Sequence, residues 1–177
     1  MDERSESEPT STKNHTTAEQ KSEREFVVTR AFNCPAHIVF EAWTKPELLK
    51  RWWAPKSFGV SFLSCEADVR TGGTYRFAFG HSASEKPMAF FGRYIEVTPH
   101  SRLVWTNDEG GEGGDVTTVT FEERGGKTLV VMHDLYHSKE ALDAAIASGS
   151  TAGFIETFKQ LDELLVTMGV SAERSFS

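Results

Sequence analysis

Residues 153–168 read GFIETFKQLDELLVTM, and this stretch decides how the rest of the chain packs. Its apolar residues recur three or four positions apart, which places them on one side of an α-helix; they are Phe154, Phe158, Leu161, Leu165 and Met168. The helix is expected to run from about Ser138, a suitable N-cap, to Met168, with a break near residues 148–150. Residues 169–177 are expected to fray. A long helix with one apolar side needs a surface that buries it.

That surface is predicted by the stretch TYRFAFG at residues 74–80, where every second residue is aromatic, so that one face of a β-strand would be aromatic. Short segments of this kind continue to residue 134, separated by turn residues such as Gly72-Gly73 and Gly125-Gly126. The predicted strands are Phe58–Asp68, Thr74–Gly80, Met88–Thr98, Arg102–Asn107, Val116–Glu123 and Lys127–Asp134. Short connections favour hairpins and therefore an antiparallel sheet.

The N-terminal part adds one strand and two short helices. Residues 25–32 (EFVVTRAF) are rich in β-branched and aromatic residues and predict a strand. Pro35 and Pro46 are well placed to open helices over 36–44 and 47–53. The predicted fold is therefore α+β: a curved antiparallel sheet of about seven strands, two short helices, and the long C-terminal helix across the concave face. The domain would span residues 24–168, and residues 1–23, which are almost wholly polar, would form a disordered tail.

Composition excludes several classes of function. The 177 residues fit one domain, and the formal net charge of −7 disfavours binding to nucleic acid or to an anionic membrane surface. No apolar run approaches the length of a membrane-spanning helix, and the polar start is unlike a signal peptide. Cys34 and Cys65 are therefore expected to be free thiols in a reducing cytoplasm, with a Cys34–Cys65 disulfide as the alternative.

Three groups of residues form a more specific pattern. They are the segment from Phe32-Asn33-Cys34-Pro35 to Trp52-Trp53, the turn Asp68-Val69-Arg70-Thr71-Gly72-Gly73-Thr74-Tyr75, and Gly92-Arg93-Tyr94-Ile95-Glu96-Val97-Thr98-Pro99 followed by Arg102-Leu103-Val104. In this order, over about residues 24–166, the chain resembles the "activator of heat-shock protein 90 ATPase homologue" domain family. The resemblance implies the helix-grip fold of the START-related (SRPBCC) superfamily, in which an apolar ligand is typically held between sheet and long helix.

Aromatic residues are the main candidates for a ligand site, because such sites are concave and mostly apolar with few polar anchors. We expect the candidate ligand-binding residues to face the space between sheet and helix; they are Trp43, Trp53, Phe58, Phe77, Phe79, Phe91, Arg93, Trp105, His133, Phe154 and Phe158. The alternative is that the aromatic residues only fill the core.

No metal, cofactor or catalytic residue is predicted. His133 and His137 are four residues apart at a predicted strand end and turn, so they do not share a face as they would on a helix. The glycine-rich loop of residues 108–115 is acidic, which is unsuitable for a phosphate. No catalytic triad order, nucleophile elbow or dinucleotide motif occurs.

Arg93 is the most specific candidate. Strict alternation groups it with Phe91, Ile95 and Val97 on an otherwise apolar face, so it would point into the pocket and need an anionic partner. A ligand carboxylate would serve, and an internal acid such as Glu66 is the competing partner. The further alternative is a bulge at Gly92 that leaves Arg93 on the surface.

Three functions remain open at this point. The first is binding of a small hydrophobic molecule such as a lipid, polyketide or aromatic metabolite. The second is an interaction domain whose partner is a chaperone, and the third is a cyclase- or hydrolase-like enzyme that uses polar groups in the pocket. A large closed cavity would favour the first or third, and a filled core with an exposed apolar patch would favour the second.

Overall fold

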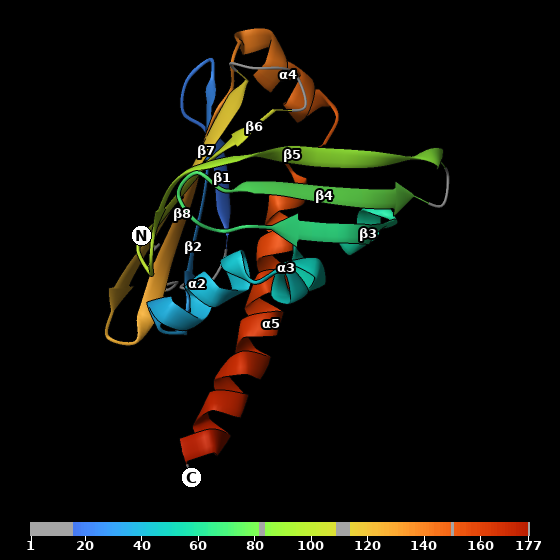
Figure 1. The fold of residues 1–177 in the computed structure, drawn as a ribbon. Coiled ribbons are helices and arrows are strands. Elements are labelled where there is room, and N and C mark those ends of the chain that lie inside the picture. Colours follow the sequence, from blue (N-terminus) through green and yellow to red (C-terminus); the bar gives the residue numbers. More distant parts are fainter. Residues whose placement is uncertain (1–15, 82–83, 109–113, 150, 177) are drawn as a thin grey trace, which may run out of the picture.

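The structure is a computed structural model that describes residues 16–81, 84–108, 114–149 and 151–176. One antiparallel sheet contains the described strands in the order β1-β2-β8-β7-β6-β5-β4-β3 (Figure 1). The strands are β1 (Thr17–Gln20), β2 (Glu25–Phe32), β3 (Val60–Ala67), β4 (Thr74–His81), β5 (Ser84–Thr98), β6 (Arg102–Asn107), β7 (Asp115–Arg124) and β8 (Lys127–Leu135). The helices are α2 (Ala36–Thr44), α3 (Pro46–Trp52), η2 (Lys56–Phe58), α4 (Lys139–Ala147) and α5 (Gly153–Phe176). The predicted fold class is confirmed.

Helix ends follow local chemistry. The Glu123 carboxylate accepts a hydrogen bond of 2.8 Å from the backbone N–H of Ala36, which caps α2 from strand β7. Ser138 accepts from the N–H of Ala141 at 3.0 Å and so caps α4, as its position in the sequence predicts. Gly149 has a φ of 86°, a conformation that favours glycine, and it divides the predicted long helix into α4 and α5.

Both ends of the predicted domain need correction. Residues 17–20, which we expected to be disordered, form strand β1 and pair with β2 from Thr17 opposite Thr29 to Gln20 opposite Phe26. An edge strand is held mainly by backbone hydrogen bonds, so its polar side chains gave no signal. At the other end, the backbone of α5 continues to Phe176 instead of ending at Met168. The prediction for residues 1–15 falls outside the described residues.

Helix α5 lies across the concave face of the sheet and is fixed there by rings and by polar side chains. Phe154 packs on Phe26 and Phe158 on Phe32, with ring centroids 6.3 and 6.1 Å apart. Gln160, which is buried, donates to the carbonyls of Trp52 and Ala54 and accepts from the N–H of Lys56, all within 3.0 Å. The helix therefore holds both the sheet and the segment that follows α3.

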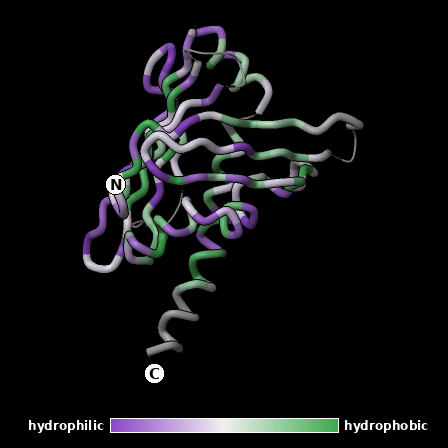
Figure 2. Tube along the Cα trace, viewed as in Figure 1, coloured by the Kyte–Doolittle hydropathy of each residue, from purple (hydrophilic) through white to green (hydrophobic). Residues whose placement is uncertain are grey.

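The helix does not cover the whole sheet. In Figure 1, β3, β4 and β5 extend to the right past α5, and Figure 2 shows apolar residues continuing along this projecting part of β4 and β5. The other end of α5 extends below the rest of the molecule. The distal halves of three strands therefore present a sheet face that α5 leaves open.

Candidate functional site

The concave face carries a central aromatic cluster, which we define as Trp43, Trp52, Trp53, Phe77 and Trp105. Trp43 comes from α2, Trp52 and Trp53 from the end of α3, and the others from β4 and β6. Neighbouring rings lie 4.7–6.1 Å apart, within the range of favourable aromatic contacts. Phe158 of α5 closes the cluster, 6.0 Å from Trp43. Helices α2 and α3, which Pro35 and Pro46 open, and strand β6 thus bring four tryptophans to one place.

The interior at this cluster is nearly filled. A void of about 20 Å³ remains, lined by Trp43, Leu49, Trp53, Tyr75, Phe77, Tyr94 and Trp105. This volume is enough for about one water-sized group. The lining residues are all uncharged. At this cluster, the described residues therefore enclose a small, partly open void, not a cavity that could hold a lipid.

The same face becomes accessible at its distal end, at what we call the distal apolar patch. It consists of the exposed Met88 and Phe90 of β5, the half-buried Phe62 of β3 and the buried Phe79 of β4. Met88 is opposite Phe79, and Phe90 is opposite Phe77, so both point to the concave side. Met88 and Phe90 remain 45% and 40% exposed. Exposed large apolar side chains that gather beside a core indicate a contact surface.

A row of ring contacts joins the distal apolar patch to the central aromatic cluster. Phe90 lies 5.4 Å from Phe79, and Phe79 lies 4.4 Å from Phe62. The row continues from Phe62 to Phe77 and from Phe77 to Trp53, each step being 5.8 Å. Trp53 is half-buried and also borders the void. An apolar path therefore runs from the surface to the void.

Two residues that border the void carry a donor without a partner among the described residues. Trp43 is 2% exposed, and its indole N–H is fully buried and has no acceptor among the described residues. Tyr94 is 5% exposed and its hydroxyl makes no hydrogen bond to another described residue, but this hydroxyl is not among the fully buried unpaired atoms. Burial raises the pKa of Tyr94 above its usual range, so the hydroxyl keeps its proton. By contrast, the N–H of Trp52 donates to Ala42 O and the hydroxyl of Tyr75 donates to Thr106 O.

A buried carboxyl group lies in the same row of the sheet. Across four strands Tyr94 is opposite Trp105, Trp105 opposite Thr117, and Thr117 opposite Asp134. Burial raises the pKa of Asp134 to about 6, although the hydrogen bond from the Thr117 hydroxyl opposes this rise. Asn107 in turn donates to the Thr117 hydroxyl at 3.1 Å. Asp134 is therefore a buried carboxyl group whose pKa, at about 6, lies close to neutral pH.

A second internal charge belongs to Arg30, which points to the concave side between sheet and α5. Its guanidinium lies 3.2 Å from Asp162 of α5, donates to Thr16 at 3.1 Å, and stands over the Phe32 ring. Burial lowers the pKa of Arg30, and Asp162 opposes that effect. This ion pair ties β2 to α5. Among the described residues, Arg30 is therefore an arginine that lies mostly inside the fold.

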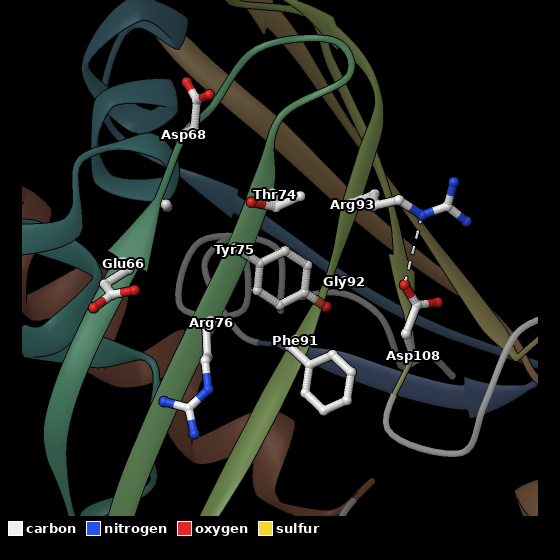
Figure 3. Close-up of a pocket in the computed structure, with 10 residues that line it drawn as sticks. Glu66, Asp68, Thr74, Tyr75, Arg76, Phe91, Gly92, Arg93 and Asp108 are labelled. Atoms are coloured by element: carbon white, nitrogen blue, oxygen red, sulfur yellow. Dashed lines mark ion pairs between the residues drawn. The ribbon is translucent and has the colours of Figure 1, made fainter.

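Arg93 does not point into the interior, and the prediction that it anchors a ligand there is wrong. Its side chain is 62% exposed on the outer face, where Nε lies 3.7 Å from Asp108 (Figure 3). Phe91 and Ile95 also face outward, whereas Tyr94 is buried. The pairing of β5 with β6 shifts between Tyr94 and Glu96, so Val97 returns to the core side. Strict alternation ignores this bulge. It therefore assigned Glu96 to the face of Tyr94 and Val97 to the face of Arg93, so that the outer face appeared to be the apolar one.

Gly92 is not the bulge. A Cβ atom at this position would lie 2.0 Å from the carbonyl oxygen of Thr106. Glycine is therefore required because β5 and β6 approach closely here.

The outer face around Arg93 is hollowed. A shallow concavity of about 780 Å³ is bordered by Glu66, Arg76, Phe91, Arg93 and Asp108, among others (Figure 3). Phe91 is 42% exposed, and Arg76 has no ion partner among the described residues. This outer concavity is open and charged, unlike the concave side of the sheet.

The other candidates divide between the two faces. Trp43, Trp53, Phe77, Phe79, Trp105, Phe154 and Phe158 lie on the concave side, as expected. His133 lies on the outer side and contacts Glu25 at 2.9 Å, so its placement in the pocket is wrong. Val130 and Met132, on the opposite face of β8 from His133, are apolar residues of this strand that enter the core. The side chain of Phe58 is outside the described residues.

Several residues of this site were missed. Tyr94 and Phe90 were missed because strict alternation, which ignores the bulge, assigned their face of β5 to the outside. Arg30 could have been found, since Phe26, Val28, Arg30 and Phe32 alternate along β2 and three of them are apolar.

The two cysteines are free thiols. Burial raises the pKa of both Cys34 and Cys65 to about 11, so neither is a reactive thiolate at neutral pH. In the part of the chain that the structure describes, no helix has the length and apolar character needed to cross a membrane.

Comparison with solved structures supports the fold. A protein from Rhodobacter sphaeroides aligns with a TM-score of 0.77 at 23% identity, over 86% of this chain and 99% of its own. A protein from Nitrosomonas europaea gives a TM-score of 0.75 at 22% identity, over 85% and 99%. An AHSA1-like protein from Aeromonas hydrophila gives 0.60 at 19% identity, over 78% and 92%.

At the level of sequence, no curated protein matches the chain. The family model described as "Activator of Hsp90 ATPase homolog 1-like protein" matches residues 33–166, which include α2, α3, the strands β3 to β8 and the first half of α5. The expected resemblance is confirmed. The chain belongs to the activator of Hsp90 ATPase homolog 1-like family and has its helix-grip fold.

Proposed function

We propose that the protein binds a small apolar molecule, such as a lipid, polyketide or aromatic metabolite, on the concave face of its sheet. The observation that carries this proposal is the row of ring contacts from the distal apolar patch to the central aromatic cluster. Burying the exposed surface of Met88 and Phe90 against a ligand would be favourable.

The size of the void decides where the ligand lies. About 20 Å³ cannot hold an apolar molecule, so its body must rest on the distal apolar patch. Trp53, half-buried at the end of α3, lies between patch and void in the row of rings. Rotation of this side chain would extend the site inward.

A matched pair of variants tests the proposal. Phe90 and Phe91 are neighbours on β5 with similar exposure, and they point to opposite faces. Phe90→Ser should weaken binding of the neutral dye Nile red about tenfold, since it removes an aromatic contact, whereas Phe91→Ser should leave it unchanged. Dye fluorescence measures both affinities. Equal effects of the two changes, or no dye binding to the unmodified protein, would contradict the proposal.

The outer concavity favours a second candidate, contact with another protein. The core is nearly filled, and Phe91 stands exposed between Arg76 and Arg93. Exposed aromatic and arginine side chains are typical of interface hot spots. In that case Phe91→Ser, and not Phe90→Ser, should reduce binding to purified heat-shock protein 90 in a calorimetric titration. The same two variants thus separate the two functions.

The compartment is proposed to be the cytoplasm. The free thiols of Cys34 and Cys65 support a reducing compartment. The formal net charge of −7 supports a protein that stays in solution.

A further inference from the structure

The two unpartnered donors at the void carry an inference about the ligand that rests on the proposed function. Trp43 N–H and Tyr94 O–H come from different elements, α2 and β5, and both side chains border the same void. The Trp43 N–H is the buried donor of the two. A buried donor without an acceptor is costly, and nearly all such groups in folded proteins are satisfied by protein, water or ligand. We propose that the void receives an oxygen acceptor of the bound molecule, held by Trp43 and Tyr94.

The volume supports one atom of this kind. About 20 Å³ accommodates a single water-sized group, such as a carbonyl oxygen, while the remainder of the molecule lies along the rings toward the distal apolar patch. The void is therefore the polar end of the site, and the distal apolar patch is its apolar end.

The charge of the acceptor follows from the lining. All seven residues around the void are uncharged, and the internal arginine, Arg30, is already paired with Asp162. A carboxylate placed there would lose its hydration without gaining a cation. The ligand class is therefore an apolar molecule with a neutral acceptor, such as a ketone, ester or amide.

Three probes of similar shape test this inference: benzophenone, which has a carbonyl group; diphenylmethane, which lacks it; and diphenylacetate, which carries a carboxylate. Their dissociation constants are measured by calorimetry with the full chain. We expect benzophenone to bind at least tenfold more tightly than either of the others, because only its oxygen satisfies the two donors without burying a charge.

Three conservative variants locate the effect. Trp43→Phe and Tyr94→Phe remove the unpaired donors and should each bring benzophenone close to the affinity of diphenylmethane. The matched control is Tyr136→Phe, which removes the hydroxyl of another buried tyrosine, one that does not line the void. This control should keep the preference for the ketone. Circular dichroism establishes that each variant is folded, and Tyr94→Phe provides the test if Trp43→Phe is not.

The outcomes are distinguishable. Equal binding of benzophenone and diphenylmethane to the unmodified protein would overturn the inference, because the donors would then serve only a water molecule. Tighter binding of diphenylacetate would overturn it as well. In either case the proposed function would stand, since an apolar molecule still binds. Absence of binding by Nile red and by every probe would overturn both.

Discussion

Asp134 is a single residue whose burial has a measurable cost. Its pKa is 3.8 in the unfolded reference and about 6 in the fold, so between these pH values the folded protein holds a proton that the unfolded chain has lost. Stability from this group therefore falls as pH rises from about 4 to 6, by up to about 3 kcal/mol at neutral pH.

Replacement of Asp134 by asparagine tests this. Asn keeps an oxygen for the Thr117 hydroxyl and carries no charge. Asp134→Asn should raise the free energy of unfolding by about 1–3 kcal/mol at pH 7 and by little at pH 4. Urea unfolding at both pH values measures it, with the exposed Asp143→Asn as a control that should change little. A variant that is less stable at pH 7 would show that the charge has a partner.

At the scale of single elements, helix α5 depends on one amide. Gln160 satisfies three backbone groups at Trp52, Ala54 and Lys56, and a leucine there would leave all three without that partner. Gln160→Leu should lower stability by about 2 kcal/mol or more, although leucine is the more apolar residue. Lys159→Leu, on the exposed side of the same turn, is the control for helix propensity. Thermal unfolding compares them, and equal melting temperatures would contradict the role of Gln160.

Strand β1 was not predicted from the sequence, and two truncations measure its contribution. Removal of residues 1–15 leaves β1 intact, whereas removal of residues 1–22 also deletes β1 and the Arg30–Thr16 hydrogen bond. The longer deletion should cost about 1 kcal/mol more, or 2–4 °C in melting temperature. Calorimetric scans of the two proteins measure this difference. Identical melting curves would mean that β1 adds nothing to the stability of β2.

For the whole molecule, periodicity predicted the order of helices and strands. Buried apolar residues recur every three or four positions in a helix and every second position in a strand. The helix stripe from Phe154 to Met168 and the alternation of Tyr75, Phe77 and Phe79 are examples. The candidate site was predicted only in part. Alternation fails where the register shifts, as at Tyr94–Glu96, and one such shift exchanged the two faces of β5. The void and its unpaired donors depend on packing between α2, α3 and the sheet, which no local pattern encodes.

The close approach of the four tryptophans also has an optical consequence. The ring centroid of Trp43 lies 4.7 Å from that of Trp52 and 6.1 Å from that of Trp105, and the centroids of Trp53 and Trp52 are 5.3 Å apart. These are all the tryptophans in the chain. At such separations the indoles absorb light as coupled oscillators, which gives a two-signed band in circular dichroism, and excitation migrates among them before emission. A molecule that quenches one indole therefore dims all four, so the protein carries its own fluorescent sensor of what occupies its concave face.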